Sequence, residues 1–133
     1  MTASAPNIRG VTPFMHVPDL KAALQWFDML GFRPRFHQDN YAYVEREGAG
    51  VRLVESRADD GTPFPPHKGF SIYLDVADVD AIVAEVRPKL AGAKVETIGP
   101  VNQVYAQREF MVRAPDGNVL VFGQALGPSR RTD

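Results

Sequence analysis

The chain has 133 residues, with 15 lysine or arginine side chains against 16 aspartate or glutamate side chains and a formal net charge of −1. Nucleic acids and anionic membranes both require a basic surface, so we expect neither as a partner. The chain has no cysteine, which excludes a disulfide framework, a thiolate metal site and a cysteine nucleophile. No stretch approaches the ~18 apolar residues of a membrane span, and the N-terminus has no secretory pattern. The sequence predicts one compact domain in the cytoplasm.

The first half of the chain predicts a strand, an amphipathic helix and three further strands. Residues 11–17 are rich in β-forming side chains. Asp19 is a candidate N-cap for a helix that runs to about Leu30, and Gly31 then ends it. The three strands that follow are expected at residues 32–37, 41–46 and 51–56.

The second half repeats this order. A strand at residues 69–76 precedes Asp78, which can cap a helix through about Leu90 that Pro88 tightens near its end. Three strands are expected around residues 93–97, 104–113 and 119–123, the last two joined by the strong turn signal of residues 114–118. The expected boundaries are a first unit at about 8–57, a linker at 58–68, a second unit at about 69–124 and a tail at 125–133.

A faint internal repeat supports this division. Residues 17–24 are echoed 59 residues later by residues 76–83, and residues 48–53 are echoed 69 residues later by residues 117–122. Two copies of one supersecondary unit bury a common core by packing together. The predicted fold is therefore α+β and consists of two βαβββ units.

Strand alternation separates two faces in each unit. Ile72, Leu74 and Val76 form an apolar face that we expect beneath the helices, which leaves Ser71, Tyr73 and Asp75 on the other face. The repeat places Thr12, Phe14 and His16 on the corresponding face of the first unit. Polar and aromatic residues in mid-strand favour a ligand pocket. The alternative is a half-solvated sheet face that binds nothing.

Several motifs resemble those of a known superfamily. They are Pro18-Asp19-Leu20, Trp26-Phe27, Leu30-Gly31-Phe32 and the stretch from Arg108 to Asn118 that precedes Phe122. Together they resemble the vicinal-oxygen-chelate superfamily, which contains glyoxalase I, extradiol dioxygenases and bleomycin-resistance proteins, and the bleomycin-resistance branch most of all. The resemblance implies two βαβββ modules, each sheet forming half of a cup, in a homodimer.

Enzymes of that superfamily hold a divalent metal with His or Glu at four positions, which the resemblance maps to Thr12, Arg52, Ser71 and Val121. None of these four is a good ligand, and Arg52 would place a fixed positive charge at the metal. We expect no metal and no cofactor. The residues from which another metal centre could be built are His16, His37, His67, Glu45, Glu55 and Glu109.

The resemblance also implies ligand-binding positions. Proteins of the bleomycin-resistance branch stack flat ligand groups on aromatic side chains in a groove between two subunits. The matching positions here are Phe36, Tyr41, Tyr73 and Tyr105, with Ser56 as a polar contact, and alternation adds His16. For each aromatic residue the alternative is ordinary sheet packing.

Charge bears on the ligand's identity. Bleomycin-binding proteins are markedly acidic, whereas this chain is nearly neutral and offers Arg52 and Arg108 near the inferred groove. A neutral or anionic ligand then fits better than a polycation. The alternative for Arg108 is a pair with Glu109 or another neighbour on the strand.

Ser56, Ser71 and Thr12 have no evident His and acid partners, so the sequence predicts no catalytic residue. The leading hypothesis is a metal-independent homodimer that sequesters a partly planar small molecule. One alternative is a metal-dependent lyase, isomerase or dioxygenase with a displaced site around His16 and Glu55 or Glu109. Another is a scaffold that binds no ligand.

Overall fold

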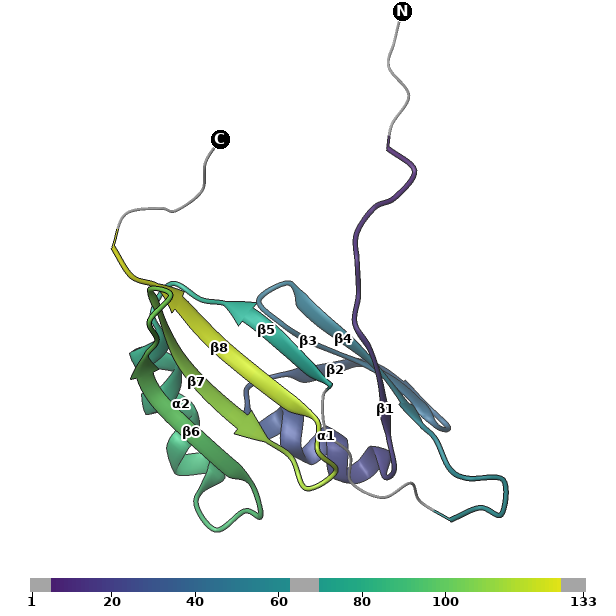
Figure 1. Cartoon of the computed structure of the whole chain (residues 1–133). Coiled ribbons are helices and arrows are strands. Elements are labelled where there is room, and N and C mark those ends of the chain that lie inside the picture. The colour runs from purple at the N-terminus through teal and green to yellow at the C-terminus, as the bar shows by residue number, and fades with distance from the viewer. Residues whose placement is uncertain (1–5, 63–69, 128–133) are drawn as a thin grey trace, which may run out of the picture.

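The computed structural model describes residues 6–62 and 70–127, which form two four-stranded sheets and two helices (Figure 1). The first unit contains β1 (Phe14–Val17), α1 (Leu20–Met29), β2 (Arg33–Gln38), β3 (Tyr41–Arg46) and β4 (Ala49–Glu55). The second contains β5 (Ser71–Asp75), α2 (Val79–Leu90), β6 (Glu96–Asn102), β7 (Gln107–Arg113) and β8 (Val119–Ala125).

Both sheets have the same topology. Their strand orders are β1-β4-β3-β2 and β5-β8-β7-β6, and in each the first strand pairs in parallel with the last while the other pairs are antiparallel. The predicted α+β fold with two βαβββ units is therefore confirmed.

The helices begin where the sequence places them. Asp19 and Asp78 have extended backbones, and each carboxylate accepts a hydrogen bond from the amide three residues later, at 3.1 Å in both cases. This is the N-cap geometry that satisfies one free amide at a helix start. At the end of α1, Gly31 takes a φ of +87°, a left-handed conformation that suits glycine. Helix α2 continues past Pro88 to Leu90.

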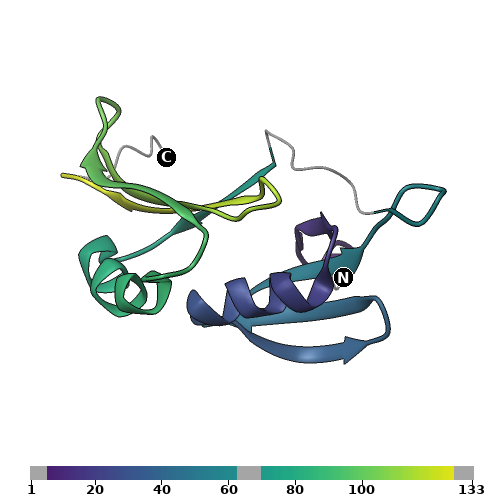
Figure 2. The ribbon, with the colours of Figure 1, turned by 90° about the horizontal axis from the view of Figure 1, so that it is seen from below.

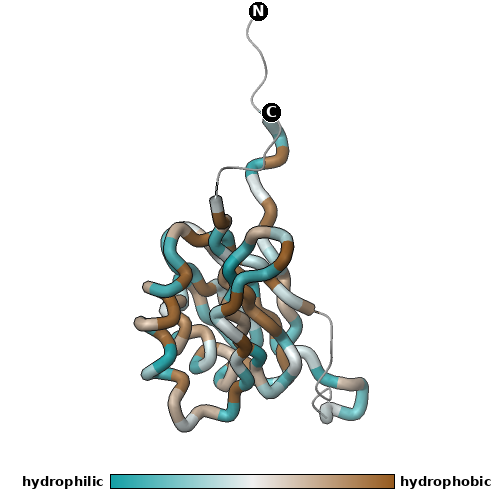
Figure 3. The backbone as a smooth tube through the Cα atoms, turned by 60° about the vertical axis from the view of Figure 1, so that its left-hand side comes forward, coloured by the Kyte–Doolittle hydropathy of each residue, from teal (hydrophilic) through white to brown (hydrophobic). Residues whose placement is uncertain are grey.

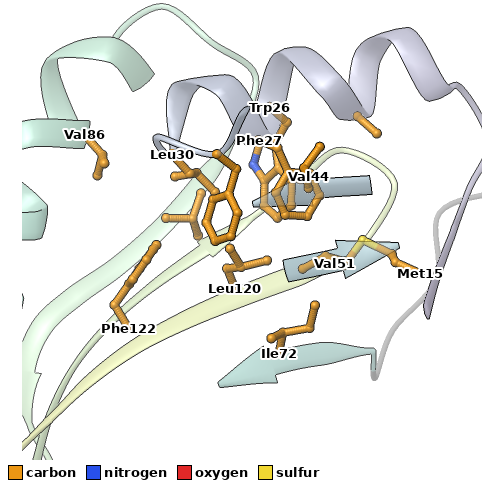
Figure 4. Close-up of a cluster of buried hydrophobic side chains, with 14 of the residues drawn as sticks. Met15, Trp26, Phe27, Leu30, Val44, Val51, Ile72, Val86, Leu120 and Phe122 are labelled. Atoms are coloured by element: carbon orange, nitrogen blue, oxygen red, sulfur yellow. The ribbon is translucent and has the colours of Figure 1, made fainter. Parts of the chain in front are cut away.

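One hydrophobic core serves both units. Its buried side chains come from α1, α2 and one face of each sheet. Figure 4 shows part of this cluster, including Trp26, Leu30, Val51, Val86 and Leu120. Each helix lies against its own sheet (Figure 2). Because the helix-bearing faces of both sheets supply the core, the opposite faces are turned outward.

We call these outward faces the open faces. Along the first sheet, buried residues alternate with open-face residues, and β5 of the second sheet alternates in the same way. In the rest of the second sheet, Glu109 and all residues from Val119 to Gly123 are buried, so its open face is less exposed than that of the first sheet. The open face of the first sheet carries Phe14, His16, Phe36, Gln38, Tyr41, Tyr43, Arg52 and Val54. That of the second carries Ser71, Tyr73, Asp75, Ile98, Val101, Glu109, Met111, Val119, Val121 and Gly123.

The N-terminal arm, residues 6–13, projects from the body of the molecule (Figures 1 and 3). The strand expected from Val11 begins only at Phe14, and Val11 is 92% exposed. Ile8 is also exposed, so the apolar side chains of this arm do not pack against the rest of the described chain.

The limits of the other strands lie within three residues of the predicted ones, and β6 differs most. This strand was expected at residues 93–97 but spans Glu96–Asn102, with a register shift between Ile98 and Val101. It is an edge strand, where Pro100 disturbs few ladder hydrogen bonds. Parts of the expected linker and tail, residues 63–69 and 128–133, lie outside the described residues, as does His67. Among the helices described, none is long and apolar enough to cross a membrane.

Candidate ligand-binding site

The open face of the first sheet brings an arginine and four aromatic side chains together. Arg52 of β4 lies opposite Phe14 of β1 on one side and Tyr43 of β3 on the other, and Phe36 of β2 extends the same row. In the next row, Tyr41 and His16 flank Val54. Residues in register on one face of a sheet are close neighbours, so this row forms one continuous surface.

The aromatic rings touch each other while remaining open to solvent. Tyr41 makes edge-on contacts with Phe14, at 6.2 Å between ring centroids, and with Phe36, at 5.9 Å. Phe14 is 50% exposed and Phe36 is 49% exposed. Large apolar rings that are held in place but half exposed can stack on a flat ligand group.

Arg52 is fixed by two tyrosines. Its Nη1 donates a hydrogen bond to the Tyr41 hydroxyl at 2.6 Å, and its guanidinium carbon lies 5.4 Å from the centre of the Tyr43 ring. The hydrogen bond with Tyr41 raises the pKa of Arg52 above its ordinary value. A permanent positive charge therefore lies within the aromatic surface.

His16 joins this surface from β1. Its ring stacks on Phe14 with centroids 5.6 Å apart, and its Nδ1 lies 2.7 Å from the Ser56 hydroxyl oxygen. Neighbouring Glu55 is engaged elsewhere, because it accepts a hydrogen bond from the Leu20 amide and lies 3.5 Å from Arg57. A site that combines His16 with Glu55 would have to break these contacts.

The open face of the second sheet holds a partly buried group of polar side chains. The Tyr105 hydroxyl donates to Glu109 at 2.7 Å, and the Tyr73 hydroxyl donates to Gln107 at 3.2 Å. The Glu109 residue is only 8% exposed. Burial, followed by the hydrogen bond and charge of Glu109, raises the pKa of Tyr73 well above that of an ordinary tyrosine.

A glycine makes room for Tyr73. A Cβ atom built at Gly123 of β8 would collide with the phenol of Tyr73, so the ring lies directly over the glycine backbone. Gly50 of β4 makes the same space for Tyr43 on the first sheet. These glycines thus shape the open faces.

The structure divides the predicted site residues into two groups on different sheets. Phe36, Tyr41, His16, Arg52 and Ser56 gather on the first unit. Tyr73 and Tyr105 lie on the second unit, beside Glu109. Phe14 and Tyr43 were not among the predicted ligand-binding residues, although strand alternation places Phe14 on the same face as His16. Glu109 was considered only for a displaced metal centre.

Arg108 does not join either group, which corrects the expectation that it lies near the groove. It shares strand parity with the buried Phe110, so it lies on the helix-bearing side. There its guanidinium pairs with Asp80 of α2 at 3.0 Å and donates to Asn102 at 2.9 Å. Of the partners considered for Arg108 on the strand surface, Asn102 of the neighbouring β6 accepts a hydrogen bond from it. Glu109 makes no described contact of this kind with Arg108.

The side chains at the four mapped metal positions do not fit a divalent metal. Arg52 occupies one of these positions and is bonded to Tyr41, whereas Val121 offers no donor atom. Thr12 and Ser71 supply only neutral hydroxyl groups. Within residues 6–62 and 70–127, no three His, Asp or Glu side chains come together as a metal site.

The fold defines a protein of two fused βαβββ units that share one core and turn their open sheet faces outward. The model of the Glyoxalase/Bleomycin resistance protein/Dioxygenase superfamily matches residues 11–122, and the chain belongs to this superfamily. No curated protein matches the sequence at a significant level.

Solved structures of antibiotic-resistance and antibiotic-binding proteins are similar in fold. A bleomycin resistance determinant encoded on the transposon Tn5 superposes with a TM-score of 0.73 at 16% identity, over 89% of this chain and 98% of that chain. The bleomycin-binding protein of Streptomyces verticillus, complexed with copper(II)-bleomycin, gives 0.68 at 23% identity over 93% and 100%. TnmS3, an antibiotic-binding protein from a Streptomyces species, gives 0.63 at 26% identity over 91% and 99%.

Proposed function

We propose that this protein binds a partly planar small molecule in grooves formed between two copies of the chain, and that it acts by sequestration without a metal ion. The observation that carries this proposal is the exposed aromatic surface of Phe14, Phe36 and Tyr41 on the open face of the first sheet. Each ring that stacks on a ligand adds about 0.5–1.5 kcal/mol beyond the area it buries.

The arrangement of the sheets supports a dimer. Both helices pack in one core on the helix-bearing faces, so neither helix covers an open face in the single chain. A second copy that supplies its own open face would close each groove, and the two equivalent contacts of a twofold dimer would create two such grooves. The projecting N-terminal arm provides further apolar surface for this contact.

Two further observations support binding over catalysis. The side chains at the mapped metal positions do not fit a metal, and His16 is hydrogen bonded to Ser56 instead of being paired with a carboxylate. The solved neighbours bound to or named for bleomycin make antibiotics the first compounds to test. A ligand of this kind is held by enclosure and stacking, with no bond made or broken.

Metal independence is tested by metal analysis of the purified, untagged protein, followed by thermal unfolding with added Zn²⁺, Ni²⁺, Mn²⁺ or Fe²⁺. A ligand that binds only the native state must raise the unfolding temperature. We expect substoichiometric metal and no shift. One metal ion per chain with a clear shift would overturn the proposal and favour a metal-dependent enzyme.

Ligand binding is tested by thermal unfolding in the presence of bleomycin, other planar antibiotics and aromatic acids. We expect at least one planar compound to stabilise the protein, and Phe36→Ala to weaken its binding. Val104→Ala is the matched control, because Val104 is an exposed apolar residue that makes no described ring contact. Sedimentation velocity should give a dimer, and a monomer at all concentrations would contradict the shared groove.

A further inference from the structure

We propose that the ligand carries a carboxylate on or next to its planar ring, and that Arg52 binds this group on the open face of the first sheet. This inference rests on the proposed ligand-binding function and adds the chemical class of the ligand. It depends on the charge balance, the geometry and the fold position of Arg52.

The charge of Arg52 is not neutralised by an acidic neighbour in the described part of the chain. Six other arginines each have a nitrogen within 3.5 Å of a carboxylate oxygen, namely Arg33, Arg35, Arg46, Arg57, Arg108 and Arg113. Glu45, an acid on the same open face, is paired with Arg35 at 2.9 Å. Arg52 therefore presents an uncompensated positive charge to a ligand.

The guanidinium is oriented but not saturated. Its Nη1 donates to Tyr41, while Nε and Nη2 make no hydrogen bond with any described residue. A planar fork of two free donor groups matches the two oxygens of a carboxylate. Tyr41 and Tyr43 hold the group in one orientation, so little side-chain freedom is lost when an anion binds.

The fold itself does not require arginine at this position. In the second sheet the equivalent residue is Val121, which lies opposite Tyr73 and Met111 just as Arg52 lies opposite Phe14 and Tyr43. Val121 is 7% exposed and packs as an ordinary sheet residue. The second sheet thus shows that the equivalent backbone position can hold an uncharged residue, so the charge of Arg52 is not needed for the fold.

The position of the rings specifies the ligand further. Phe14 and Tyr43 lie on either side of Arg52, and the guanidinium already lies over the Tyr43 ring, so a carboxylate bound to Arg52 would place its attached ring over Phe14. His16 stacks on Phe14 and bonds to Ser56, and therefore adds a polar edge next to the same surface. An aromatic carboxylic acid would pair with the charge of Arg52 and also stack on the neighbouring ring, whereas an uncharged aromatic compound would only stack.

The test compares 2-naphthoate with 2-naphthamide, which has the same ring system without the negative charge, by isothermal titration calorimetry. We expect the acid to bind the unchanged protein about tenfold or more tightly than the amide. Arg52→Gln should weaken binding of the acid about tenfold or more and binding of the amide much less, which removes the preference, and Arg52→Lys should restore part of it. Arg33→Gln removes the same charge from the Asp28 pair and should preserve the preference.

The outcomes distinguish failure of the carboxylate inference from failure of the proposed ligand-binding function. Equal binding of acid and amide, unaffected by Arg52→Gln, would overturn the inference while leaving planar-ligand binding intact. Binding of neither probe, together with no stabilisation by any planar compound in the wider screen, would overturn both. Thermal unfolding of each variant controls for folding, and Arg52→Val repeats the test with the residue that the second sheet uses.

Discussion

The guanidinium of Arg46 and the carboxylate of Glu85 lie 2.6 Å apart and connect the two βαβββ units, since Arg46 belongs to β3 and Glu85 to α2. Arg46 also donates to the Leu30 carbonyl at 2.9 Å, at the end of α1. Its side chain is only 15% exposed. One side chain therefore links a strand, the end of one helix and the other unit's helix.

Replacing Arg46 should weaken the junction of the units. We expect Arg46→Met to lower the free energy of unfolding by about 1–3 kcal/mol, because it removes several hydrogen bonds of a charged group and leaves the Leu30 carbonyl without this donor. Urea unfolding followed by the fluorescence of Trp26, the single tryptophan, measures the change. Arg33→Gln is the control, since both members of its pair are exposed and the change should stay below about 1 kcal/mol. Equal effects of the two variants would contradict the linking role.

The N-caps of α1 and α2 should contribute separately to the free energy of unfolding. Asp19→Ala and Asp78→Ala each remove the acceptor of one amide at a helix start, and each should reduce stability by about 1 kcal/mol. Asn at either position keeps an acceptor and should restore most of the loss. Circular dichroism with urea unfolding provides the measurement, and full additivity of the double variant is expected because the caps lie on different helices.

Tyr73 should make stability depend on pH in the alkaline range. Its pKa in the folded protein is raised by burial and by Glu109, Asp75 and Tyr105, so the unfolded chain loses this proton first as the pH increases. The stabilising contribution is complete below the unfolded pKa of about 10 and is lost as the pH rises above it. Unfolding measured between about pH 9 and pH 11 should become easier with pH, and Tyr73→Phe should reduce that slope. A Tyr43→Phe variant with the same reduction would contradict the assignment to Tyr73.

Gly123 should tolerate no side chain. Gly123→Ala places a methyl group where the Tyr73 phenol lies, and the forced movement should lower stability by about 1–3 kcal/mol. Displacement also moves the phenol away from Gln107 and Glu109, so an ultraviolet titration of the tyrosines should detect ionisation at lower pH. Gly10→Ala is the matched control, because a Cβ at Gly10 meets nothing within 4 Å. An unchanged titration in Gly123→Ala would mean that the ring adapts without leaving its partners.

The sequence predicts local structure well where one residue determines it. Asp19 and Asp78 mark both helix starts, and strand β3 has the predicted limits Tyr41–Arg46. The predicted limits of β6 were wrong, because the strand continues through Gly99 and Pro100, which an edge strand accommodates through a register shift.

The candidate site was predictable only in part. Period-2 alternation is enough to place His16, Tyr41 and Arg52 on one face, because each side chain's direction follows from strand parity. It also separates Arg108 from that face, although its partner Asp80 depends on how α2 packs and could not be read from the strand. The row of Phe14, Arg52, Tyr43 and Phe36 depends on the register of three strand pairs, which turn lengths and bulges determine.

The shared core separates the residues that stabilise the fold from those that face outward, two roles that usually compete in small proteins. Folding depends on the faces that meet around α1 and α2, whereas the outward faces add little to that packing. Outward-facing residues that no neighbouring ring covers, unlike Gly123, can therefore be substituted with small effects on stability. The equivalent position carries Arg52 in one sheet and Val121 in the other. A chain built in this way can acquire preferences for new compounds one surface residue at a time, while its scaffold remains unchanged.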